Sequence, residues 1–445
     1  MRIAYLTAGA AGMYCGTCLQ DNTLAAALRA RGCDVLLLPL YTPIRTDEVN
    51  VSLERVFYGG VNVYLQQKSA FFRHTPWLID WLLDRPAIIR WATGRAVSNQ
   101  PEGLGPLTVS MLQGEEGRQR KELRKLVRWL AAEGRPDVVV LSNSLLSGVA
   151  REIRRLLKVP VFCRFSSEDL FIEGIDEPHR THCRRLLRER LAEMDGLIAP
   201  SGYSADFMAA YAELPRERIR VVPQGLDFTR REPAETRGDE TLTIGYFTRI
   251  APEKGLRVLA EAYRHLRHDY PDMACRLHVG GYLAPSDQEY FDDVRRSIEG
   301  WGFGDDFHYV GETDFAGKIR FLNHLDVFSV PTTYAEPKGL YVLEALAAGV
   351  PVVQPRHGVF PELIEQTGGG VLFEPGNAAS LAEALGRLLP NVAERRRLGS
   401  AGKESVQQRF TADKMAEGML DVLTAALVPS ARRVPVAPTA KSSAI

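Results

Sequence analysis

The hydrophobic pattern alternates between short apolar runs and amphipathic stretches along most of the chain. Near the start, apolar residues 3–7 and 34–39 flank an amphipathic stretch at 18–31. Apolar runs of this length are typical of strands buried on both faces, and apolar positions repeating about every 3.6 residues predict helices. Strands that alternate with helices predict a parallel sheet covered by helices. The pattern therefore predicts an α/β protein with doubly wound sheets.

The same alternation occurs twice along the chain. The strands expected in the first half are 3–7, 34–39, 136–141, 159–165, 196–199 and 219–222. The helices expected there are 18–31, 118–133, 145–157, 179–194 and 203–211. The strands expected in the second half are 242–247, 276–280, 307–310, 327–330, 350–353 and 368–373. The helices expected there are 256–268, 286–300, 315–322, 339–348, 379–389, 393–410 and 412–427.

This repetition predicts two Rossmann-like domains, and we expect them to face each other across a cleft. We assign residues 1–227 to the first domain and 241–410 to the second. Residues 228–240 are charged and lack periodicity, which is typical of a linker. Residues 411–427 form a separate C-terminal helix, and the tail at 428–445 has too few apolar residues to fold, so we predict disorder there.

Composition narrows the possible partners and the compartment. The 445 residues include 55 basic and 55 acidic side chains, so no global positive field favours nucleic acid. The six cysteines lack regular spacing, which indicates free thiols in a reducing cytoplasm. The N-terminus is too short and Gly-rich for a signal peptide, and no apolar run reaches transmembrane length. We therefore expect a cytoplasmic protein, with peripheral contact at the inner face of the membrane left open.

The most informative stretch is 330–356, which reads as strand, loop, helix and strand. A loop rich in Pro, Thr and Gly leads into the helix, and a helix start offers free N–H groups and positive potential to an anion. Glu336 lies in the loop and Glu344 about one turn into the helix. Because carboxylates accept hydrogen bonds from sugar hydroxyls, this combination predicts a ligand that carries both phosphate and hydroxyl groups.

A second cluster of charge follows the first strand of the second domain. Arg249 and Lys254 lie in Thr-Arg-Ile-Ala-Pro-Glu-Lys-Gly, at the turn between a strand and a helix. Cations at such a turn favour a diphosphate, and each contributes a few kcal/mol against a unit charge at contact, at an effective dielectric of about 20. The alternative is an exposed basic turn.

The segment from Glu336 to Glu344, with seven residues between them, runs into Ala-Leu-Ala-Ala-Gly-Val-Pro-Val-Val. This resembles the donor-site motif of retaining glycosyltransferase family 4. The resemblance implies that Glu336 contacts the donor sugar, that Glu344 holds the nucleotide ribose, and that the Gly339 and Leu340 amides bind the diphosphate. It also implies that Arg249 and Lys254 neutralise the leaving nucleoside diphosphate. Lys338 departs from the Phe that is most common in the family.

The first strand–helix loop carries Cys15-Gly-Thr-Cys18. Family 4 members usually have Gly-Gly in this loop, and the match places Gly16 on the second glycine and Cys15 on the first. The spacing of Cys15 and Cys18 before a helix is also that of a redox dithiol. A single Cys-x-x-Cys without a second pair argues against zinc. Loop packing with close approach of a ligand is the third reading.

The acceptor side gives weaker signals. After the strand that ends at 165, relatives often place a His in the acceptor pocket, and Ser166 holds that position here. Glu168 and Asp169 follow and either supply polar or acid/base contacts or are solvated loop carboxylates. Within the irregular stretch 46–110, residues 55–65 read as two strands around the Gly-Gly turn at 59–60. This strand pair and Phe71-Phe72 weakly resemble the acceptor-side insert of glycogen and starch synthases. The tryptophans of this stretch either line an acceptor groove or pack in a core: Trp77, Trp81 and Trp91.

These features predict a hexosyltransferase. The expected donor is a nucleoside-diphosphate-sugar, UDP- or GDP-linked, and the expected acceptor is a hydroxyl on a glycan, a lipid-linked sugar or a small molecule. The resemblance implies retention of configuration and a last helix, 411–427, that packs back on the first domain. No metal or other cofactor is expected, because protein cations balance the diphosphate. Rival interpretations are an epimerase or phosphorylase, a dithiol oxidoreductase, and a non-catalytic sugar-nucleotide binder.

Overall fold

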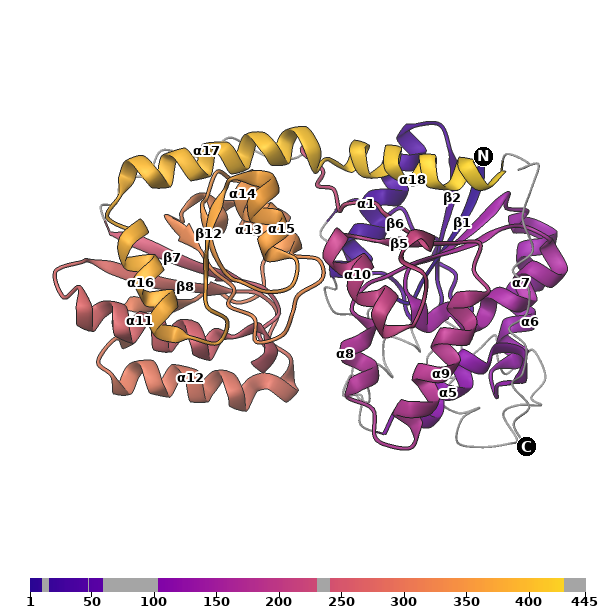
Figure 1. The fold of residues 1–445 in the computed structure, drawn as a ribbon, viewed down its shortest axis with the longest axis horizontal. Helices are drawn as coiled ribbons and strands as arrows, with labels where there is room; N and C mark the ends of the chain where they lie inside the picture. Colours follow the sequence, from indigo (N-terminus) through magenta and orange to yellow (C-terminus); the bar gives the residue numbers. More distant parts are fainter. Residues whose placement is uncertain (10–15, 47, 59–102, 230–240, 428–445) are drawn as a thin grey trace, which may run out of the picture.

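The structure, a computed structural model, describes residues 1–9, 16–46, 48–58, 103–229 and 241–427 (Figure 1). Within these ranges the chain forms two α/β domains that lie side by side, each built on a parallel six-stranded sheet. The predicted fold class, two Rossmann-like doubly wound domains, is confirmed.

The first sheet has the strand order β2-β1-β3-β4-β5-β6. Its strands are β1 (Arg2–Thr7), β2 (Asp34–Pro39), β3 (Val138–Leu141), β4 (Val161–Arg164), β5 (Gly196–Ala199) and β6 (Ile219–Val221). Along β1, Ala4 and Leu6 pack into one apolar cluster, whereas Ile3 and Tyr5 pack into another on the opposite face. Because both faces are buried, the strands read as continuous apolar runs.

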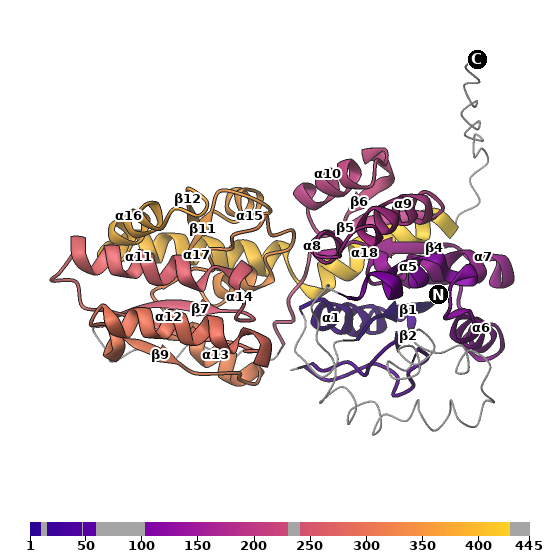
Figure 2. The ribbon, with the colours of Figure 1, turned by 90° about the horizontal axis from the view of Figure 1, so that it is seen from below.

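Helices surround this sheet (Figure 2). They are α1 (Gly16–Ala30), α5 (Gly105–Gln113), α6 (Arg120–Trp129), α7 (Ala150–Leu157), α8 (Glu168–Glu173), α9 (His179–Ala192) and α10 (Gly202–Tyr211). Short 3₁₀ segments are η2 (Gly114–Glu116), η4 (Ser144–Val149) and η5 (Arg216–Arg218), and a π-helical segment is η3 (Leu130–Gly134).

The second sheet has the strand order β12-β11-β10-β7-β8-β9. Its strands are β7 (Leu242–Phe247), β8 (Cys275–Gly280), β9 (Phe307–Tyr309), β10 (Val327–Phe328), β11 (Val352–Pro355) and β12 (Gly370–Phe373). The helices are α11 (Leu256–Asp269), α12 (Gln288–Gly300), α13 (Phe315–Asn323), α14 (Leu340–Ala347), α15 (Phe360–Thr367), α16 (Ala378–Leu388), α17 (Val392–Arg409) and α18 (Ala412–Leu427). Short 3₁₀ segments are η6 (Pro252–Lys254), η7 (Pro285–Asp287) and η8 (Gly304–Asp306).

The strand order of the second sheet reverses between β7 and β10. Strands β8 and β9 continue from β7 on one side, and β11 and β12 continue from β10 on the other. In open α/β sheets, ligands bind at such a switch point, beyond the carboxyl ends of the strands. The loop after β7 carries Arg249 and Lys254, and the loop after β10 carries Glu336. The topology thus brings the two predicted charged segments together.

The chain connects the two domains twice, at neighbouring points. Leu226 donates a backbone hydrogen bond to Phe410, and Ala412 donates one to Leu226, at 2.8 and 2.9 Å. Beyond this point α18 packs against α1, with Met415 and Met419 buried in the apolar cluster of the first domain (Figure 1). Helix α17, by contrast, lies along the second domain.

Several local expectations differ from the structure. The helix expected at 145–157 begins as the 3₁₀ segment η4 and becomes α-helical only at Ala150. Helices α5 and α15 were not predicted, because α5 begins within the irregular stretch 46–110 and α15 has only eight residues. The C-terminal tail at 428–445 and most of the linker at 228–240 lie outside the described residues.

No helix among the described residues combines the length and the apolar character that crossing a lipid bilayer requires.

Candidate active site

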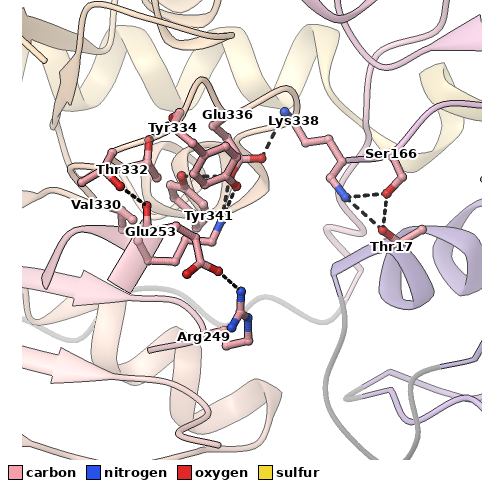
Figure 3. Close-up of polar contacts among 12 residues, drawn as sticks. Thr17, Ser166, Arg249, Glu253, Val330, Thr332, Tyr334, Glu336, Lys338 and Tyr341 are labelled. Carbon is pink, nitrogen blue, oxygen red and sulfur yellow. Dashed lines mark hydrogen bonds and ion pairs between the residues drawn. The ribbon is translucent and has the colours of Figure 1, made fainter. Parts of the chain in front are cut away.

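Glu336 is the centre of a buried polar cluster at the switch point of the second domain (Figure 3). The Lys254 ammonium lies 2.7 Å from Glu336 Oε2 and 2.6 Å from the Tyr334 hydroxyl. Tyr334 also donates to the same carboxylate oxygen, and Tyr341 donates to it at 3.4 Å. The ammonium lies over both rings, 4.9 Å from the Tyr334 centroid and 5.5 Å from that of Tyr341. The cluster therefore fixes one carboxylate with a cation and two phenols.

The electrostatics of this cluster keep Glu336 ionised. Burial alone would raise the pKa of its carboxyl, but the ammonium groups of Lys254 and Lys338 outweigh burial and lower the pKa to about 2. A carboxylate with so low a pKa is a poor proton acceptor at neutral pH. Its chemical use is to accept hydrogen bonds from a ligand and to hold a negative charge in a fixed place.

Two loops must approach closely to build the cluster, and a glycine allows it. Gly255 has φ +76°, and a Cβ there would lie 1.8 Å from the Pro331 carbonyl oxygen. Beside it, the Thr333 amide donates to the Glu253 carbonyl at 3.0 Å. Pro252 opens the 3₁₀ turn that carries Lys254 toward Glu336.

The start of α14 offers backbone donors next to this carboxylate. Gly339, at φ +66°, is the N-cap residue of the helix. No described residue accepts a hydrogen bond from the N–H groups of Gly339 or Leu340, which are among the orphan donors of a helix start. The Lys338 amide, in contrast, donates to Glu336 Oε1 at 3.3 Å. The predicted phosphate-binding amides are thus available beside Glu336.

Arg249 lies at the edge of the cluster rather than in direct contact with Glu336 (Figure 3). Its guanidinium pairs with Glu253 and lies 3.7 Å from Asp287, and its side chain is about 41% exposed. The structure therefore places Lys254 against Glu336 and pairs Arg249 with two carboxylates of its own.

Glu344 lies on α14, where the two domains meet. Its Oε1 accepts from the Lys318 ammonium at 2.7 Å. Lys318, Leu340 and Glu344 line a narrow hollow together with first-domain residues that include Gln20 and Thr23. Lys318 was missed in the sequence because a lone lysine within α13 carries no motif.

Ser166 and Thr17 come from the first domain and meet Lys338 across the cleft (Figure 3). The Lys338 ammonium lies 2.9 Å from each hydroxyl, and the two hydroxyl oxygens are 2.7 Å apart. Thr17 is in the first turn of α1, and Ser166 follows β4. Thr17 and Tyr334 were missed as site residues, although both lie within three residues of a residue that the motifs marked.

The structure excludes one of the two alternatives that the sequence left open for Glu168. It begins α8 and is buried, so it is not a solvated loop carboxylate. Its two oxygens accept from the Ser144 and Ser166 amides at 2.7 and 2.8 Å. Burial raises its pKa, and the two amides and the Lys338 charge only partly offset that rise. The sequence left both alternatives open because a Glu next to Asp and Ser reads as loop, whereas the fold turns Glu168 inward as a brace between two strand ends.

Asp169 lies beside Glu168 on α8 and is partly buried. Burial raises its pKa, with a further contribution from the negative charge of Glu336 across the cleft. The predicted acceptor residues Ser166, Glu168 and Asp169 thus lie together on the first-domain side. Of these residues, Ser166 contacts Lys338 of the loop before α14, and the charge of Glu336 acts on Asp169.

The first loop is described only in part. Gly16 is exposed at the start of α1, and Cys18 is buried within the helix. Cys15 lies outside the described residues, as do Trp77, Trp81 and Trp91 and most of the strand pair expected around residues 59–60.

Two models of glycosyltransferase families match this chain. The model of glycosyl transferases group 1 matches residues 227–405, and that of glycosyltransferase family 4 matches residues 95–230. Together they span residues 95–405, more than half of the chain. The chain carries domains of two glycosyltransferase families. The Glu336 cluster lies within the stretch matched by the first model, and Ser166, Glu168 and Asp169 lie within that of the second.

Curated relatives of this glycosyltransferase include two D-inositol 3-phosphate glycosyltransferases. The one from Stackebrandtia nassauensis is 26% identical over 399 residues, covering 81% of this chain and 86% of the relative. The one from Nocardia farcinica is 28% identical over 250 residues. That match covers 54% of each chain, so it spans about half the length of the relative.

Solved structures share the architecture of this glycosyltransferase. The sucrose-phosphate synthase of Thermosynechococcus elongatus superposes with a TM-score of 0.70 at 17% identity, over 96% of this chain and 99% of that one. The Anabaena protein HepE in complex with UDP superposes with a TM-score of 0.66 at 18% identity, over 96% of this chain and the whole of that one. At these identities the likeness shows the fold.

Proposed function

We propose that the protein transfers a hexosyl group from a nucleoside-diphosphate-sugar to a hydroxyl of an acceptor, with retention of anomeric configuration. The observation that carries the proposal is the switch-point cluster. There a buried, ionised Glu336 is held by Lys254 next to the free amides of Gly339 and Leu340. One small region thus offers a carboxylate that can accept hydrogen bonds from sugar hydroxyls, a cation, and N–H donors at a helix start. Together these groups suit a sugar attached to a diphosphate.

Each group has a distinct task in this proposal. The Gly339 and Leu340 amides and Lys254 bind the diphosphate and stabilise the charge that grows on it as the bond to the sugar breaks. Arg249 adds to this field from the edge of the cluster. Glu336 orients the donor sugar, since its low pKa makes it a hydrogen-bond acceptor rather than a base. Glu344 accepts from the nucleotide ribose.

The first-domain side then receives the acceptor. Ser166, Glu168 and Asp169 supply polar groups opposite Glu336, and no atom of the described residues lies within 4 Å of a Cβ built on Gly16, at the start of α1. A carbohydrate or lipid-linked hydroxyl acceptor fits this polar surface. We propose that transfer needs no metal or other cofactor, because Lys254 and the Gly339 and Leu340 amides supply positive potential for the diphosphate, with Arg249 at the edge of the cluster.

Similar proteins support a nucleotide-sugar donor. HepE from Anabaena has been crystallised with UDP and with UDP-glucose. We propose a UDP- or GDP-linked donor for this chain.

Thermal unfolding in the presence of UDP, GDP, ADP and their glucose or mannose conjugates tests the proposal. A bound ligand raises the unfolding temperature by mass action, so one base should stabilise the wild type clearly more than the Lys254→Ala variant. NMR of the product formed with an acceptor then reads the anomeric configuration. Stabilisation by none of these nucleotides contradicts the proposal. Interconversion of the donor sugar without acceptor indicates an epimerase, a strict phosphate requirement indicates a phosphorylase, and binding without any turnover indicates a non-catalytic binder.

A further inference from the structure

The Lys338 side chain leaves the donor loop and ends on the other domain (Figure 3). Its ammonium, the Thr17 hydroxyl and the Ser166 hydroxyl form a triangle with sides of 2.9, 2.9 and 2.7 Å. The three groups come from three separate segments: the loop before α14, the first turn of α1 and the end of β4. They are all partly exposed, so a ligand can reach them.

The ammonium group of Lys338 has different partners from those of Lys254 and Lys318. Lys254 and Lys318 each lie 2.7 Å from a carboxylate oxygen. Among the described residues, no carboxylate comes within ion-pair distance of the Lys338 ammonium, whose partners are the two hydroxyls. A partly buried ammonium without a paired counterion favours binding of an anion.

The nearby carboxylates do not fill that role. Lys338 lowers the pKa of both Glu336 and Glu168 through space. Glu336, however, is already paired with Lys254, and the oxygens of Glu168 accept from backbone amides. Both carboxylates hold hydrogen bonds of their own and leave the ammonium to the hydroxyls.

The triangle also has room and donors for an incoming group. A Cβ on Gly16, next to Thr17, would meet no atom of a described residue within 4 Å. An ammonium has three donors, and hydroxyls rotate to donate or accept as needed, so the triangle can direct three hydrogen bonds at one oxyanion. The Phe that is most common at position 338 in the resembling family offers none of these donors.

We propose that Lys338, Thr17 and Ser166 form a specificity subsite for an anionic group, a carboxylate or a phosphate, that one of the sugar substrates carries. The subsite lies between Glu336 and the acceptor side. The anion therefore belongs either to the transferred sugar, as in a hexuronate, or to a phosphorylated acceptor. This inference rests on the proposed glycosyl transfer and deepens it.

Matched ligand pairs test the subsite by calorimetry. The donor pair is UDP-glucose and UDP-glucuronate, or GDP-mannose and GDP-mannuronate if the protein prefers GDP. The acceptor pair is glucose and glucose 6-phosphate, added with the preferred nucleoside diphosphate at saturation. The variants are Lys338→Met, which removes the charge at similar size, and Lys338→Arg, which keeps it. Arg45→Met serves as the control, since it removes another cation that pairs across the domains, with Glu312 at 2.7 Å.

We expect the wild type to prefer the anionic member of one pair by about tenfold to a hundredfold, the range for a hydrogen bond to a charged group. Lys338→Met should abolish that preference and leave affinity for the neutral member and for the nucleoside diphosphate within about twofold. Lys338→Arg should retain most of it, and Arg45→Met all of it. Ser166→Ala and Thr17→Val should reduce it by a smaller factor. The pair that shows the preference identifies the source of the anion.

Three results overturn the inference. The first is a wild type that prefers neither anionic member, and the second is a Lys338→Met protein that keeps the preference. The third is a Lys338→Met protein that loses affinity for the nucleoside diphosphate itself, which would assign Lys338 to the diphosphate. Failure of UDP and GDP to bind the wild type would instead contradict the proposed function.

Discussion

Glu336 and Glu168 are two buried glutamates, 3% and 4% exposed, on opposite sides of the same cleft. Glu336 belongs to the second domain and is paired with Lys254, and its pKa is lowered to about 2. Glu168 belongs to the first domain, accepts from two backbone amides, and its pKa is raised by burial. Equal burial has opposite consequences, because a cation in contact outweighs desolvation and neutral amides do not.

The comparison separates two ways of building a binding surface. The second-domain side fixes charge of both signs, which suits a ligand whose own charge changes during reaction. The first-domain side uses hydroxyls, amides and carboxylates that burial drives toward the neutral form, which suits an uncharged sugar. Lys338 is the exception, since it carries charge from one side to the other.

Replacing Lys254 should have the largest effect on the difference between the two sides of the cleft. We expect Lys254→Met to lower turnover by about a hundredfold, as loss of charge stabilisation in a transition state does. The same change leaves Glu336 buried and unpaired, at a cost of about 3–5 kcal/mol in the free energy of unfolding. Steady-state kinetics and denaturant unfolding measure the two effects.

A double variant and a surface control separate these effects. Lys254→Met with Glu336→Gln should recover much of the stability but none of the turnover, because no buried charge remains. Lys414→Met, which removes an exposed pair with Glu417, should change neither by a measurable amount. Wild-type turnover in Lys254→Met would remove Lys254 from the site.

Acid unfolding tests the opposite pKa shifts directly. The pKa of Glu336 is depressed in the folded state, so its contribution is fully present above about pH 4.5 and is lost as the pH falls toward 2. A shift of this size corresponds to roughly 3 kcal/mol. The pKa of Glu168 is raised, so its effect has the opposite sign: it favours the folded state at low pH, and that contribution is lost as the pH rises through the folded pKa.

Urea unfolding between pH 3 and pH 7 measures both signs. Glu336→Gln should flatten the loss of stability on the acid side relative to the wild type, and Glu168→Gln should steepen it. Parallel pH profiles for the three proteins would mean that the two carboxyls do not differ in the way that the structure indicates.

Glu344 extends the charged side to the nucleotide. Glu344→Gln should weaken binding of the preferred nucleoside diphosphate by about tenfold if its carboxylate accepts from the ribose hydroxyls. The 2′-deoxy and 3′-deoxy nucleotides should bind the wild type about tenfold more weakly than the parent nucleotide does. They should bind Glu344→Gln as tightly as the parent nucleotide binds that variant. Additive losses in calorimetry would place Glu344 away from the ribose.

The sequence predicted the second-domain side better than the first, for a physical reason. Arg249, Lys254, Glu336 and Glu344 lie in loops and helix starts at the ends of apolar strands, and parallel strands bring those ends together. Local pattern and topology therefore sufficed to place these residues near one another. The sequence could not show that Arg249 pairs with Glu253 and does not contact Glu336, because that depends on the direction of the Arg249 side chain.

Contacts between distant segments could not be read from local patterns. Lys338 to Thr17 and Ser166 joins residues more than 170 positions apart, and Lys318 to Glu344 joins two separate helices. The burial of Glu168 depends on strands β3 and β4 ending side by side, so that Ser144 and Ser166 both reach it. Such contacts follow from the packing of the whole sheet and have no signature in one segment.

The mildest test concerns Glu168. Glu168→Gln keeps the size of the side chain and one carbonyl-type acceptor, but its amide cannot accept from both the Ser144 and the Ser166 N–H groups. We expect the end of β4 to shift slightly, so that the KM for the acceptor rises several-fold while affinity for the nucleoside diphosphate stays within about twofold. An unchanged acceptor KM would make Glu168 a structural brace alone. A loss of nucleotide affinity equal to that of Glu344→Gln would mean that the two sides of the cleft are not as separate as their electrostatics indicate.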